Sequence, residues 1–124
     1  MSTFHAVVWI DHNEAHVLKF DREHVEAQRI KSRSHHKHQG KADDAAAFYA
    51  EVAQTLQGSH EVLVTGPGLA RNAFRGWCSV HQKVTADVIM DSIASDHPTD
   101  AQLVALAKQY FKKFDAMAAD PTQT

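Results

Sequence analysis

Hydrophobic residues in the first quarter of the chain follow the spacing of β-strands. Residues 4–10 (FHAVVWI) form a nearly continuous apolar run, which is typical of a strand buried on both faces. Residues 16–20 alternate as a half-buried strand does, and residues 24–30 alternate with more polar side chains, as in an edge or partly covered strand. Polar turns at 11–14 and 21–23 separate them. The pattern predicts an antiparallel three-stranded meander.

Apolar residues in the rest of the chain recur at helical spacing in three segments. Short apolar runs at 61–65 and 84–90 separate these segments and predict two further strands. The residues expected to face the core are Ala45, Phe48, Val52 and Leu56 in the first helix, Ala70, Ala73, Phe74 and Trp77 in the second, and Leu103, Leu106, Tyr110, Phe114 and Met117 in the third.

Capping residues indicate where these helices begin. Asp43 or Asp44 offers an N-cap for the first helix, and Pro67 suits the first helical position of the second. Thr99 and Gln102 have the spacing of a capping box, so the last helix should begin between them.

The element order βββαβαβα predicts the fold class. A meander followed by βαβα units gives an α/β fold with a mixed five-stranded sheet and helices on its faces, which is the ribonuclease-H-like order. With 124 residues, 44% of them hydrophobic, we expect one domain over 1–117 and a frayed tail over 118–124.

Composition excludes several classes of protein. A single cysteine, Cys78, rules out an intramolecular disulfide, and it is expected in the core with Trp9 and Trp77. The chain shows neither a charged-then-apolar leader nor an apolar run near the roughly 20 residues that span a bilayer. We therefore expect a cytoplasmic protein without a membrane partner. The sequence leaves the oligomeric state open.

One segment reverses the sign of the chain's charge. The formal net charge is −2, yet no acid lies between Glu26 and Asp43. The basic segment, residues 29–41 (RIKSRSHHKHQGK), has no regular apolar pattern and predicts a loop. Local positive charge suits a polyanion, because neutralised phosphates release counterions. A solvated loop without a ligand, or a surface for an acidic protein, are the competing interpretations.

Three features together resemble a known family: the opening meander, the glycine-containing basic segment before the first helix, and GPGLARNAF at 66–74 after the fourth strand. This combination resembles the middle domain of the archaeo-eukaryotic class I release factors and of their ribosome-rescue relative Pelota. Pelota-like proteins have GPG-x-x-K-x-x-F at this point. Here Arg71 replaces the lysine and Phe74 matches.

The resemblance implies a translation-associated role, like that of small bacterial stand-alone relatives of this domain. It implies binding to the ribosome or to structured RNA such as tRNA or rRNA, without a cofactor. The residues expected to bind RNA are Lys31, Arg33, His35, His36, Lys37, His38, Gln39, Gly40, Lys41 and Arg71.

Binding is favoured over catalysis, and two hydrolytic alternatives stay open. Release factors carry a Gly-Gly-Gln tripeptide in the loop before the first helix, whereas Lys37 and His38 precede Gln39 here. Peptidyl-tRNA hydrolysis through Gln39 would lack the backbone freedom of those glycines.

Asp11 follows the first strand, where ribonuclease-H-like nucleases place a metal-binding carboxylate. Glu14, Asp87 and Asp91 are its possible partners for two-metal hydrolysis. The competing interpretation is an ordinary turn residue. The loop histidines lack the spacing of zinc ligands, so no metal site is assigned to them.

Overall fold

The computed structural model of the chain describes residues 4–21, 23–32 and 42–123, with side chains for 5–21, 23–32 and 45–112. Its elements are β1 (Phe4–Ile10), β2 (Glu14–Phe20), β3 (Val25–Lys31), α1 (Ala42–Thr55), β4 (Ser59–Gly66), α2 (Ala70–His81), α3 (Lys83–Val88), β5 (Ile89–Ala94) and α4 (Asp100–Gln123).

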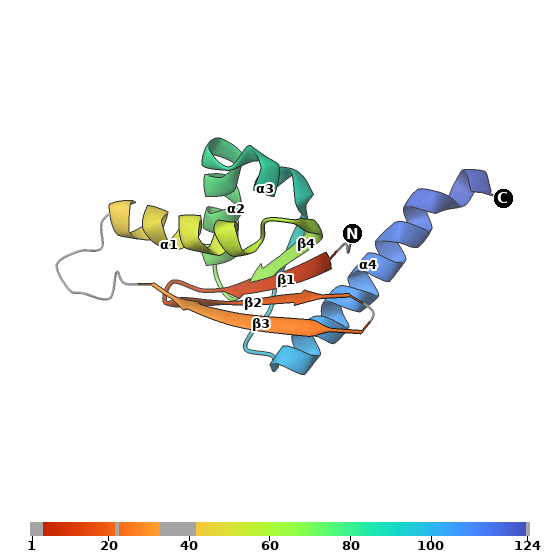
Figure 1. Cartoon of the computed structure of the whole chain (residues 1–124), viewed down its shortest axis with the longest axis horizontal. Helices are drawn as coiled ribbons and strands as arrows, with labels where there is room; N and C mark the ends of the chain where they lie inside the picture. The colour runs from red at the N-terminus through yellow and green to blue at the C-terminus, as the bar shows by residue number, and fades with distance from the viewer. Residues whose placement is uncertain (1–3, 22, 33–41, 124) are drawn as a thin grey trace.

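The five strands form one mixed sheet in the order β3-β2-β1-β4-β5. β1, β2 and β3 pair antiparallel, as the predicted meander requires, and β4 pairs parallel with both β1 and β5. Helices α1, α2 and α3 lie over one face of the sheet, and α4 crosses the other (Figure 1). The predicted α/β, ribonuclease-H-like fold is confirmed, and β3 is an edge strand as expected.

The core has two layers, one on each face of the sheet. β1 supplies both, because its successive side chains point to opposite faces and residues 6–10 are at most 2% exposed. Val8 and Ile10 pack under α1 and α2 with Phe48 and Phe74, whereas Val7 packs under α4. The prediction of a strand buried on both faces is correct for β1. It also applies to β2, which was expected to be only half-buried.

The segment from Val84 to Met90 differs from its prediction. It was expected to be a strand, but its first part forms α3 and β5 begins only at Ile89. Val84 is 81% exposed, whereas Thr85 is buried on the inner side of α3. The β-branched residues that suggested a strand therefore belong to a short helix, of which Thr85 and the partly buried Val88 face inward.

Helix faces and starts are partly as predicted. In α4 the buried residues are Leu103, Ala107 and Phe111. The predicted Leu106 and Tyr110 pack partly buried against the same cluster, and the side chains of Phe114 and Met117 lie outside the described residues. In α2, Ala73 is exposed and Cys78 takes the inward position. The helix starts at Ala70, so the prediction that Pro67 lies near the first helical position was wrong. α1 begins at Ala42, before both acidic residues proposed as its N-cap.

The capping box of α4 is confirmed. The Thr99 backbone N–H donates to Gln102 Oε1 at 2.9 Å, and the Gln102 N–H donates to Thr99 Oγ1 at 3.1 Å. α4 then runs to Gln123, so the domain boundary at 117 stays a prediction. In the ranges that the structure describes, no helix is both long and apolar enough to span a bilayer.

Candidate nucleic-acid interface

The basic segment begins on the outer edge of the sheet. Arg29 and Lys31 are exposed on β3, while Ile30 between them is buried in the core under α1. Ser32 is buried, and its backbone N–H donates to the carbonyl oxygen of Asn13 at 2.8 Å. The start of the segment is therefore held against the β1–β2 turn. The end of β3 and the start of α1 lie at the same end of the sheet (Figure 1).

Most of the predicted RNA-binding residues lie outside the described part of the chain. These are Arg33, His35, His36, Lys37, His38, Gln39, Gly40 and Lys41. Their assignment, and the hydrolytic alternative through Gln39, stay predictions. Of the predicted set, the structure places Lys31 and Arg71.

The two cations on β3 lie opposite ionisable residues of β2. The antiparallel register pairs Lys31 with Glu14 and Arg29 with His16. Directly opposed residues of an antiparallel pair share one face of the sheet, here the face that α4 covers. The basic segment therefore leaves the sheet from a polar row next to α4.

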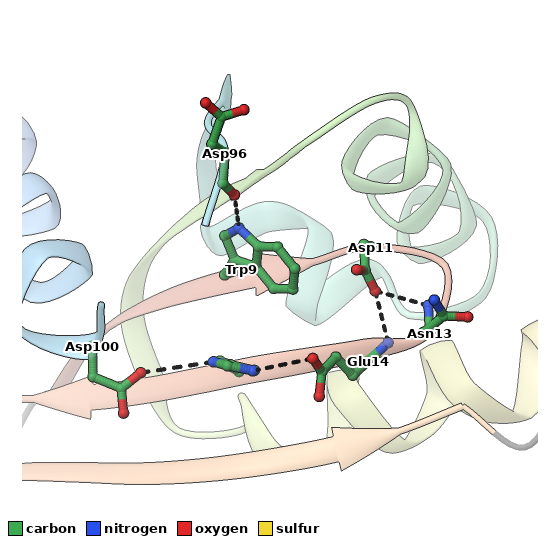
Figure 2. A network of polar contacts seen from close by, with 7 residues as sticks. Trp9, Asp11, Asn13, Glu14, Asp96 and Asp100 are labelled. Carbon is green, nitrogen blue, oxygen red and sulfur yellow. Dashed lines mark hydrogen bonds and ion pairs between the residues drawn. The ribbon is translucent and has the colours of Figure 1, made fainter. Parts of the chain in front are cut away.

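His16 lies at the centre of this row. Its Nδ1 is 3.7 Å from Asp100 Oδ1, its Nε2 is 3.7 Å from Glu14 Oε2, and its ring lies 5.3 Å from the ring of Trp9. Dashed lines in Figure 2 mark these two contacts of Glu14 and Asp100. Within the described residues, His16 Nε2 is buried without a hydrogen-bond partner. The pairing of His16 with Asp100 could not be recognised from the sequence, because the two residues are far apart along the chain.

Asp11 is a turn residue in the structure. Its Oδ1 accepts hydrogen bonds at 2.8 Å from the backbone N–H groups of both Asn13 and Glu14 (Figure 2). This arrangement closes the β1–β2 turn, as in the competing interpretation. No three His, Cys, Asp or Glu side chains among the described residues are grouped so that they could hold a metal ion. The nuclease alternative through Asp11, with Glu14, Asp87 and Asp91 as its partners, stays a prediction.

Arg71 lies at the first turn of α2, away from the edge that β3 forms. Its Nε donates to the carbonyl oxygen of Gly66 at 3.3 Å, and its Nη1 donates to Ser92 Oγ at 3.0 Å and Asn72 Oδ1 at 3.1 Å. Ser92 Oγ also donates to Asn72 Oδ1 at 2.9 Å. Arg71 therefore ties the end of β4 to β5, and its predicted RNA contact stays untested.

Of the side chains Trp9, Trp77 and Cys78 that were expected in the core, Trp9 and Cys78 are buried and Trp77 is partly buried against it. Trp9 is 2% exposed, and its Nε1–H donates to the carbonyl oxygen of Asp96 at 2.6 Å (Figure 2). Cys78 is fully buried, and burial raises the pKa of its thiol to about 12. A thiol that stays protonated at neutral pH is a poor nucleophile, so Cys78 has a packing role.

Several solved structures have the same fold. The chain superposes on the Thermoplasma acidophilum Pelota protein with a TM-score of 0.63 and 21% identity, over 82% of this chain and 30% of that one. An archaeal translation termination factor matches with a TM-score of 0.61 and 14% identity, over 93% of this chain and 39% of that one. A Saccharomyces cerevisiae translation termination-like factor, involved in RNA quality control pathways, matches with a TM-score of 0.60 and 10% identity, over 93% and 35%.

These matches show that this chain has the fold of one domain of those factors. The chain spans between 30% and 39% of the length of these three structures. No protein-family model and no curated protein matches the sequence.

Proposed function

We propose that this protein is a translation-associated module that binds the ribosome or structured RNA through the basic segment, residues 29–41. The observation that carries the proposal is where this segment starts: Arg29 and Lys31 project from an exposed edge strand, on a fold found in translation termination factors. The yeast factor that shares the fold is involved in RNA quality control pathways, which also supports an RNA partner. A cytoplasmic location follows from this role.

The proposed chemistry is phosphate neutralisation. Each lysine or arginine that meets a phosphate releases a condensed counterion, which makes binding stronger at low salt. Neither α1 nor α4 covers the exposed side chains of Arg29 and Lys31, so an RNA backbone can reach them without a change of fold. Lys31 stands opposite Glu14, and contact with a phosphate would replace this cross-strand partner.

Salt titration of RNA or ribosome binding tests the proposal. Alanine at Lys31, Arg33, Lys37 and Lys41 should weaken binding and flatten the plot of log affinity against log salt by about 0.7–0.9 per lost contact. A matched variant that exchanges lysine and arginine at the same four positions keeps the charge and should retain the slope. Removing four exposed cations elsewhere, Arg75, Lys83, Lys108 and Lys112, controls for net charge.

Wild-type binding that does not depend on salt would contradict the proposal. So would an alanine variant that binds like the wild type, because the segment would then be a solvated connection. Peptide release from peptidyl-tRNA, measured beside binding, should be absent, since Lys37 and His38 replace the glycines that give the release-factor loop its backbone freedom. Release that is lost on Gln39→Ala would favour the hydrolytic alternative.

A further inference from the structure

A hollow of about 190 Å³ lies between the start of α4 and the exposed edge of the sheet. α4 covers Leu18 on β2, which is 1% exposed, but leaves the opposite β3 residue, Ala27, exposed. The methyl group of Ala27 is too small to fill the space beside the helix. The result is an apolar floor next to α4 at the edge of the sheet.

Polar groups of opposite charge line this hollow. Arg29 is exposed on one side, and Asp100 lines the other with a carboxylate whose side chain is 52% exposed. His16 lies between them, with its ring tilted against Trp9. A cation, a flat ring and a carboxylate therefore meet around a small apolar surface.

We propose that the hollow binds one unpaired nucleobase of the RNA, and that it favours a base with an exocyclic amino group. Proteins read single-stranded RNA by taking splayed bases into such sites, where the bases stack on aromatic rings or on arginine planes. A carboxylate accepts a hydrogen bond from an amino group such as N4 of cytosine. Asp100 is placed to be that acceptor, and Arg29 to hold the base or its phosphate.

The nucleobase site rests on the proposed function, and it adds a position at which the protein would distinguish one base from another. Arg29 is both the first cation of the basic segment and a wall of the hollow. An RNA backbone that follows the segment would therefore pass the opening. A free phosphate fits the hollow poorly, because the carboxylates of Glu14 and Asp100 on either side of His16 would repel it.

Two single-stranded RNA octamers, all cytidine and all uridine, test this inference on the full chain. The two bases have the same size and differ only at C4 and N3: cytosine carries an amino group and an acceptor nitrogen there, whereas uracil carries a carbonyl oxygen and an N–H. The wild type should prefer the cytidine octamer by about fivefold or more, the lower end of the discrimination that such hydrogen bonds provide. Asp100→Asn should remove most of this preference, because its amide can accept a hydrogen bond from the amino group of cytosine or donate one to the carbonyl oxygen of uracil.

A filled hollow provides the second test. Ala27→Leu should occupy the floor and weaken binding of the cytidine octamer, while leaving the exposed strand intact. Ala94→Leu is the matched control, because Ala94 is also exposed on an edge strand, at the opposite side of the sheet. In NMR spectra, cytidine octamer should shift the amide signals of Gln28 and Arg29 in the wild type but not in Ala27→Leu.

The outcomes separate this inference from the proposed function. Equal binding of both octamers by the wild type, or an Ala27→Leu variant that binds like Ala94→Leu, overturns the nucleobase site and leaves salt-dependent RNA binding by the basic segment in place. If the wild type binds neither octamer nor structured RNA at low salt, both proposals fail.

Discussion

A side-chain carbon on Gly66 would clash with the backbone carbonyl oxygen of Ile10. The two residues end the parallel strands β4 and β1, directly after the paired residues Thr65 and Trp9. Gly66 also has a φ of 145°, a backbone conformation that L side chains rarely adopt. Two independent constraints therefore require glycine at this position.

Gly66→Ala should lower the free energy of unfolding by about 2–4 kcal/mol, because it adds a clash with backbone to an unfavourable φ. Gly68→Ala is the control, since its φ is 63° but its missing side chain faces open space. That variant should lose only about 1–2 kcal/mol. Urea unfolding measures both, and equal losses would mean that the contact with Ile10 relaxes at no cost.

Arg71→Lys should lower the free energy of unfolding by about 1 kcal/mol, because an ammonium cannot bond Gly66 and Ser92 in the fork geometry of the guanidinium. Arg75→Lys, an exposed position on the same helix, should change it little. Urea unfolding distinguishes the two. RNA affinity of Arg71→Lys, measured at the same time, tests its predicted contact, and unchanged stability would contradict its role as a tie.

Asp21 should make stability depend on pH in the acid range. Backbone N–H groups of Glu23 and then His24, which donate to its Oδ1 at 2.8 and 2.7 Å, lower the pKa of this carboxyl below its usual 3.8. A lowered folded-state pKa stabilises the fold above the unfolded-state pKa, and this is lost as pH falls through the folded-state value.

Asp21→Ala should therefore be less stable than the wild type at pH 6, and the two should converge as pH falls below about 3.8. Asp21→Asn keeps an acceptor and should lose less at pH 6. Urea unfolding over this pH range provides the comparison. A difference that stays constant with pH would assign the effect to turn geometry alone.

RNA binding should strengthen when pH falls from about 7.5 to 6, because histidines gain charge in this interval. Changing His35, His36 and His38 together to glutamine should remove most of this response if the basic segment meets phosphates. His12→Gln, which changes an exposed histidine in the β1–β2 turn, is the control. The same pH response in all three proteins would place its origin outside the segment.

The opening strands could be predicted because hydrophobic spacing reports directly which faces of a strand are covered. β1 reads as an apolar run since both of its faces are buried, and β3 reads as polar since it is an edge. β5 could not be placed in the same way. Its start is set by pairing of Ile89 with Val62 on β4, and this long-range register overrides the local β-branched residues that form α3.

The candidate site was predictable only in part, for a similar reason. A run of cations is visible in the sequence, so the basic segment could be recognised. The hollow beside it depends on Asp100, which the start of α4 brings to His16. Nothing in the spacing along the chain indicates this contact, because the crossing of α4 over the sheet produces it.

Because Cys78 is buried, its reaction with a thiol reagent can report when the structure around α2 opens. The chain has one cysteine, so a thiol reagent can modify a single site. With its pKa raised to about 12 and its side chain fully covered, the sulfur should react only in molecules whose α2 has separated from the sheet. When labelling is slow compared with reclosing, the labelling rate measures the population of the opened form. The same measurement applies to any variant without an added dye or tag.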